Sequence, residues 1–188
     1  SVYESGTGQD NVPMVSLERD SFFALLFLDT YANPPSTSSF SVQRRARGTS
    51  QSPLPVQLGD WTGGFAFRAR LANQQWGQTA LISASVDQAP SNDGAPMCLS
   101  FWTGATSVSE RLRITSSGNV GIGLNQPTTR LHVNGPVRIG TFLKASLPDA
   151  VSAGAGSLIY VSDESGGATI AFSDGAVWRR CTDRQTVS

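Results

Sequence analysis

The sequence predicts an all-β protein: an antiparallel β-sandwich or flattened barrel, followed by an intertwined trimeric β-stalk and a small β-meander tip. Three observations support this fold class. Apolar and polar residues alternate with a period of two in several short segments between residues 65 and 114. The 19 glycines and 10 prolines are typical of short strands joined by many turns. After Pro34, no stretch carries the apolar period of a helix.

Composition limits the classes of partner. The net charge of the 188 residues is zero, which argues against nucleic acid, and the short run Arg44, Arg45 and Arg47 is interpreted as a solvated face. The most apolar run, residues 22–28, is too short to cross a bilayer, so we expect no membrane insertion. Cys98 and Cys181 lack metal-ligand spacing and are predicted to be buried thiols rather than a disulfide.

The first elements are the least regular. Residues 1–21 have no clear period and are predicted to be an arm or docking segment. Residues 22–31 (FFALLFLDTY) are apolar on both faces, which fits a buried strand or a short buried helix. Aromatic enrichment and the following ANPPS breaker favour a strand.

The segments that follow alternate clearly. Each carries apolar residues on one face and polar residues, often Ser or Arg, on the other, as a half-buried antiparallel strand does. The apolar members are Phe40 and Val42; Phe65, Phe67, Ala69 and Leu71; Ala80, Ile82, Ala84 and Val86; Met97, Leu99 and Phe101; and Leu112 and Ile114. Residues 22–115 are therefore predicted to form one β-sandwich or flattened barrel.

The stretch SSGNVGIG at residues 116–123 begins a different region. Its glycines do not form a dinucleotide-binding motif, because the third glycine of G-x-G-x-x-G is missing and Pro127 follows. A P-loop is excluded as well, since Lys144 is the only lysine of the chain. We therefore expect no nucleotide cofactor, and we interpret the stretch as a hairpin turn that enters a stalk.

Residues 116–146 form this predicted stalk, with one thin apolar stripe. A bare apolar sheet face is unstable in water, and the simplest cover is the same stripe on two other copies of the chain. The glycines would allow the close approach of backbones in such a trimer. The stripe consists of Val120, Ile122, Leu131, Val133, Val137 and Ile139.

Residues 147–188 are predicted to form a meander of three strands at 157–161, 168–172 and 177–181. Asp174-Gly175 is a strong signal for a hairpin turn. The expected core of this tip is Ile159, Ile170, Phe172 and Trp178. Three short strands are marginal alone, which again favours an oligomer.

Three stretches of the sequence resemble bacteriophage tail fibres and tailspikes. ERLRITSSGNVGIG followed by TTRLHVNG resembles the region before the C-terminal part of such fibres. SVQRRARGTSQSPLPVQLGDWTGGFAFRAR resembles the β-rich module that precedes it, and GAGSLIYVSDESGGATIAFSDGAVWRRCTDR is similar to a C-terminal tip sequence. Together these stretches cover about residues 38–184 in a consistent order.

The resemblance implies a homotrimeric structural protein of the virion, exposed to the medium, which attaches the phage to host surface polysaccharide without catalysis. By analogy, residues 1–21 would dock onto other virion proteins. Many such fibres end in a self-cleaving intramolecular chaperone, and we expect none here because no segment is long enough. Two alternatives remain: a trimer that decorates the capsid, as a cement protein or head fibre, and a tailspike that degrades polysaccharide.

Few residues are candidates for chemistry. His132, the only histidine, is predicted on the polar face of the stalk, so we expect neither a catalytic triad nor a metal site there. A glycosidase needs two carboxyl groups that flank the sugar; most of the available ones fall in turn signals, and no catalytic residue is assigned. These carboxylates are Asp60, Asp87, Asp93, Glu110, Asp163, Glu164 and Asp174.

Tryptophans are better candidates for receptor contact, because sugars stack on aromatic rings. Trp76 and Trp61 lie in polar sequences that read as loops, although each also fits a role in a core or a subunit interface. Trp102 is expected on the face opposite Met97, Leu99 and Phe101, and Trp178 in the core of the tip.

Overall fold

The computed structural model describes residues 41–187, without the side chains of residues 78 and 79. Within this range the protein is mostly β, with one four-residue α-helix, α1 (Ala150–Ala153), and one 3₁₀ turn, η1 (Lys144–Ser146). The prediction of an all-β protein is confirmed. The predicted arm, residues 1–21, and the segment 22–31 lie outside the described residues.

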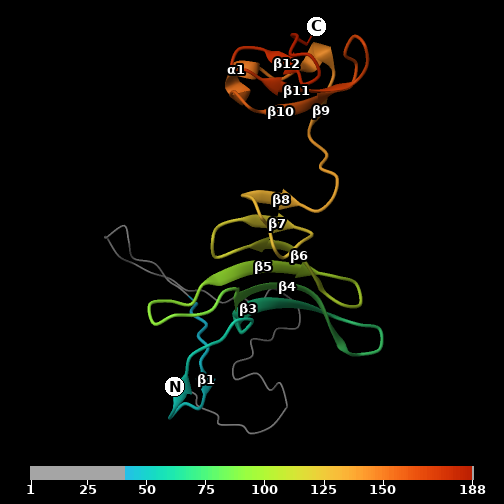
Figure 1. Ribbon diagram of the computed structural model, residues 1–188. Coiled ribbons are helices and arrows are strands. Elements are labelled where there is room, and N and C mark those ends of the chain that lie inside the picture. The colour runs from blue at the N-terminus through green and yellow to red at the C-terminus, as the bar shows by residue number, and fades with distance from the viewer. Residues whose placement is uncertain (1–40, 188) are drawn as a thin grey trace, which may run out of the picture. The chain divides into compact units, whose positions relative to one another are not determined.

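The larger sheet has six strands in the order of the sequence (Figure 1). Neighbouring strands are antiparallel from the first to the fifth, and the last two are parallel. The strands are β3 (Trp61–Arg70), β4 (Trp76–Val86), β5 (Met97–Thr103), β6 (Ser109–Ile114), β7 (Val120–Ile122) and β8 (Leu131–Val133).

This sheet corrects the predicted sandwich or flattened barrel. Strands β3 to β6 of region 22–115 lie in one open sheet, and it continues through β7 and β8 across the expected boundary at residue 115. The alternation had indicated correctly that one face of each strand is apolar. It did not reveal that the apolar faces of β3 to β8 belong to a single layer.

The connection from β7 to β8 explains one glycine of SSGNVGIG. A Cβ at Gly121 would lie 2.6 Å from the carbonyl oxygen of Leu124 and 3.4 Å from the Cδ of Pro127. The β7–β8 connection therefore folds closely over its own strand, and only glycine leaves room for it. The sequence predicts that glycines of this stretch allow backbones of different copies to approach closely. At Gly121 the close approach is instead between two segments of the same chain.

A small two-stranded ladder precedes the sheet: β1 (Arg47–Gly48) pairs with β2 (Pro53–Leu54). Residues 41–46 are not in a strand, so the prediction of a strand around Phe40 and Val42 is wrong for the residues that the structure describes. Val42 is exposed there.

The tip contains a four-stranded sheet in the order β12-β11-β10-β9 (Figure 1). Its strands are β9 (Thr141–Phe142), β10 (Leu158–Val161), β11 (Thr169–Ser173) and β12 (Trp178–Arg180). The three predicted strands of the meander are confirmed, and the turn at Asp174-Gly175 joins β11 to β12, with Gly175 at φ 93°. β9 adds residues 141–142, which we had assigned to the stalk, as a parallel neighbour of β10.

The core of the tip differs in part from the prediction. It consists of Ala150, Ile159, Val161, Ala171 and Trp178, with Ser173 Oγ donating to Ala150 O and Trp178 Nε1 donating to Pro148 O, both at 2.7 Å. Ile170 and Phe172 are not in it, because Ile159 lies opposite Ala171 in the β10–β11 register and the even-numbered residues of β11 point to the other face. Ile170 is 46% exposed.

Candidate functional site: an apolar sheet face

One face of the six-stranded sheet is apolar from edge to edge, and we call it the apolar sheet face. Directly opposed residues in the strand registers form two rows that cross all six strands. The first row is Phe65, Ile82, Phe101, Leu112, Ile122 and Val133. The second is Gly63, Ala84, Leu99, Ile114, Val120 and Leu131. Opposed apolar side chains in neighbouring strands support one another, by roughly 0.2–1 kcal/mol per pair.

The side chains of this face remain accessible to water. Phe65 is 58% exposed, Leu99 41%, Ile122 40% and Leu131 61%. Phe67, Met97 and Ile114 are also exposed. Soluble monomers rarely expose a contiguous apolar surface of this extent, and such a surface typically marks an interaction site.

The predicted stalk stripe divides between two environments. Val120 and Ile122 in β7, and Leu131 and Val133 in β8, belong to the apolar sheet face. Val137 and Ile139 lie between β8 and β9, where Val137 is 65% exposed and Ile139 is half-buried. These two line a groove of about 550 Å³ whose other apolar walls are the outward-facing Leu158, Tyr160 and Ile170 of the tip.

The opposite face of the sheet, which we call the polar sheet face, is closely packed. Ser83, Cys98 and Ser100 are 1% exposed, and Ser83 and Ser100 share a hydrogen bond of 3.2 Å between their hydroxyls. On the same face, Arg113 forms a bidentate ion pair with Glu110 (2.7 and 2.6 Å), which raises the pKa of this arginine. The sheet therefore has an accessible apolar face and a polar face that is packed in its middle strands but exposed along β3.

The two candidate tryptophans are in strands and not in loops, which corrects the prediction. Trp61 is the first residue of β3 and Trp76 the first of β4. Trp61 is 44% exposed and its ring lies 5.5 Å from that of Trp102, at an interplanar angle of 39°. Trp76 is 62% exposed, and the guanidinium of Arg70 lies over its ring at 5.5 Å.

An ion-pair cluster precedes Trp61, and nothing in the sequence singled it out. Asp60, only 6% exposed, accepts hydrogen bonds from Arg45 at 3.1 Å, from Arg47 at 2.7 Å through each of its oxygens, and from the backbone N–H of Gln57 at 2.9 Å. The hydrogen bonds from Arg47 are the main reason that the pKa of Asp60 lies well below its usual range. The basic run is therefore in part a structural cluster, and not only a solvated face.

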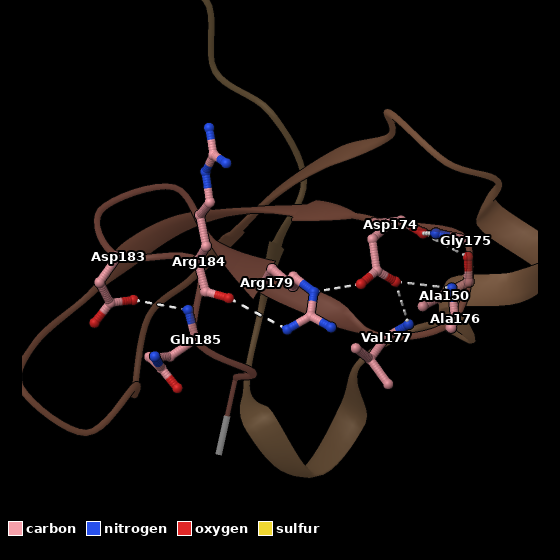
Figure 2. Close-up of polar contacts among 10 residues, drawn as sticks. Ala150, Asp174, Gly175, Ala176, Val177, Arg179, Asp183, Arg184 and Gln185 are labelled. Atoms are coloured by element: carbon pink, nitrogen blue, oxygen red, sulfur yellow. Dashed lines mark hydrogen bonds and ion pairs between the residues drawn. The ribbon is translucent and has the colours of Figure 1, made fainter.

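Other carboxylates also have structural partners. Figure 2 shows Asp174, which accepts from the backbone N–H groups of Ala176 and Val177, both at 2.9 Å, and pairs with Arg179. These contacts lower the pKa of Asp174 to about 2. Glu164 is buried and pairs with Arg180.

His132 and the cysteines have modest environments. His132 lies opposite Gly121, on the polar sheet face as predicted, and its Nδ1 is 3.4 Å from the backbone N of Thr128. Both thiols are free, as expected; Cys98 is buried, but Cys181 is exposed, which corrects the expectation for that residue. Within residues 41–187, no group of three or more potential metal-binding side chains occurs, and no helix has the length and hydropathy needed to span a bilayer.

Comparison with known proteins adds no assignment. No protein-family model matches the chain, and no curated protein matches it. The case for function therefore depends on the two sheet faces and on the resemblance of the sequence stretches described above.

Proposed function

We propose that this protein is a homotrimeric structural component of a bacteriophage virion, a tail fibre or spike that attaches the particle to host surface polysaccharide without catalysis. The observation that carries the proposal is the pair of apolar rows across all six strands of the sheet. Such a face needs a cover, and sister copies of the chain present the same face.

The apolar rows account for the association, and the resemblance of the sequence to phage fibres accounts for the number three. In a trimer, the three apolar sheet faces would turn toward one another and form the core that one chain lacks. The layered domain predicted for residues 22–115 would then be assembled between chains. The stalk residues Val120, Ile122, Leu131 and Val133 would belong to the same interface.

Energetic considerations favour this cover. Full burial of a Leu, Ile or Phe side chain contributes about 1.5–3 kcal/mol. Seven large apolar side chains of the face are 37–61% exposed: Phe65, Phe67, Met97, Leu99, Ile114, Ile122 and Leu131. Completing their burial would contribute on the order of 5–10 kcal/mol per copy, enough to offset a substantial part of the cost of association.

Attachment through three equivalent sites explains how weak sugar contacts would hold a particle. Each site needs only a modest affinity, since linked sites rebind at high effective concentration. The arm, residues 1–21, would dock onto other virion proteins, and the protein would be exposed to the medium. The carboxylates described above have structural partners, which supports binding rather than glycan cleavage.

The test has two parts. Light scattering on the purified protein is expected to give three times 19.9 kDa, and fluorescently labelled protein is expected to decorate cells of the host. If the protein is a monomer, no sister copies cover the apolar sheet face, and the argument for a trimer fails. Binding to capsids but not to cells would instead identify a capsid-decorating protein, and release of reducing ends from host polysaccharide would identify an enzyme.

A further inference from the structure

The two candidate tryptophans lie on the same face of the six-stranded sheet but at opposite ends of β3. Trp61 is paired with Ser85 in the β3–β4 register and therefore belongs to the polar sheet face. The register shift between Phe67 and Arg68 reverses the alternation of β4, so Trp76, which pairs with Arg70, also belongs to the polar sheet face. If sister copies cover the apolar sheet face, both tryptophans remain on the outside, but Trp76 is far from Trp61 along β3 and the Arg70 guanidinium lies over its ring.

Trp61 belongs to a preformed aromatic surface. Its neighbour Trp102 is fixed by its indole N–H, which lies 3.2 Å from Ser83 Oγ and 3.0 Å from Ser100 Oγ. Because both serines are buried, these bonds fix the Trp102 ring, and this ring lies 5.5 Å from the ring of Trp61 and supports it. A ring held in place before binding loses little conformational entropy when a ligand stacks on it.

The backbone of Trp61 is fixed as well, with a charged donor beside it. Arg45 donates from one nitrogen to the carbonyl oxygen of Trp61 at 3.0 Å and from the other to Asp60 at 3.1 Å. Its side chain remains 42% exposed. A guanidinium has five N–H groups, so these two bonds leave donors of Arg45 available at the edge of the aromatic surface.

We propose that Trp61, supported by Trp102, stacks on a pyranose ring of the host polysaccharide, and that Arg45 donates hydrogen bonds to the oxygens of this sugar. An exposed indole with a few convergent polar groups is the combination that recognises a sugar, because one face of a pyranose is lined with C–H groups and its rim with hydroxyls. The proposal deepens the proposed function and rests on it. It assigns receptor binding to the polar sheet face and excludes Trp76 from the site.

The experiment uses the full-length protein. An array of bacterial O-chain and capsular polysaccharides identifies a glycan that the wild type binds. A monovalent oligosaccharide prepared from that glycan is then titrated by calorimetry, so that the affinity of a single site is measured without avidity. The variants are Trp61→Ala, Trp61→Phe, Trp76→Ala and, as a matched control at a distant exposed apolar residue, Leu143→Ala.

We expect Trp61→Ala to weaken single-site binding about 30-fold, as for a tryptophan hot spot, and Trp61→Phe to restore part of it because a ring remains. Trp76→Ala and Leu143→Ala should keep the wild-type affinity. Acrylamide quenching of tryptophan fluorescence should decrease on addition of the oligosaccharide in the wild type, but not in Trp61→Ala.

Two results would overturn the inference and leave the proposed function intact. One is wild-type affinity in a folded Trp61→Ala variant, as judged by circular dichroism. The other is loss of binding in Trp76→Ala alone. A wild-type protein that decorates host cells yet binds no polysaccharide would refute the sugar as ligand, whereas one that binds neither would refute the attachment function itself.

Discussion

Placing a charge on the apolar sheet face is the most direct test of the trimer, and Leu131→Asp is the chosen change. Leu131 ends one of the two apolar rows and is 61% exposed in the single chain. A substitution at so exposed a position changes the stability of an isolated protomer by about 0.5 kcal/mol or less. Any large effect must therefore come from association.

The expected effect on a trimer is much larger. Burying the exposed part of each leucine contributes about 1–2 kcal/mol, so the three copies together lose about 3–6 kcal/mol. Three unpaired carboxylates in the interface add several kcal/mol each in desolvation. The sum exceeds roughly 10 kcal/mol, which lowers the association constant by about seven orders of magnitude.

Size-exclusion chromatography with light scattering measures the outcome. The wild type should elute at three times 19.9 kDa and Leu131→Asp at 19.9 kDa. Asn125→Asp is the matched control, because it adds the same charge at an exposed position in the β7–β8 connection and should leave the trimer intact. A Leu131→Asp variant that retains the wild-type mass would refute the assignment of this face as the interface.

Two further predictions concern stability. Gly121→Ala should lower the free energy of unfolding by about 1–3 kcal/mol in chemical denaturation, because the added Cβ would lie 2.6 Å from the Leu124 carbonyl oxygen. The control Gly94→Ala should leave the free energy of unfolding unchanged, because a Cβ there has nothing within 4 Å. Equal effects of the two substitutions would contradict the close approach at Gly121. The pKa of Asp174 is lowered from an ordinary 3.8 to about 2, so its contacts stabilise the fold above pH 4, and this contribution is lost as the pH falls from about 4 to 2. Thermal melts across that range should show a smaller acid-induced decrease in Asp174→Asn than in the wild type, and identical decreases would refute this role for Asp174.

The alternation of side chains could be read from the sequence because it is a local property of a strand. Ile82, Leu99 and Leu112 had to share a face with their apolar neighbours wherever a strand formed, since successive residues of a strand point to opposite sides. The turn at Asp174-Gly175 was equally predictable, because few residues other than glycine adopt a positive φ without strain. These features required no knowledge of the rest of the chain.

Several features were decided only by strand pairing. The sequence did not indicate that β7 and β8 extend the same sheet as β3–β6, nor that Ile170 lies outside the tip core, because register depends on partners distant in the chain. The common face of Trp61 and Trp76 also follows from strand pairing, because the register shift between Phe67 and Arg68 reverses the alternation of β4. The cluster around Asp60 likewise depends on contacts with Arg45 and Arg47, which lie more than ten residues earlier in the chain. Local periodicity thus determined which residues are apolar neighbours along each strand, whereas long-range hydrogen bonding decided which strands align them into one continuous surface.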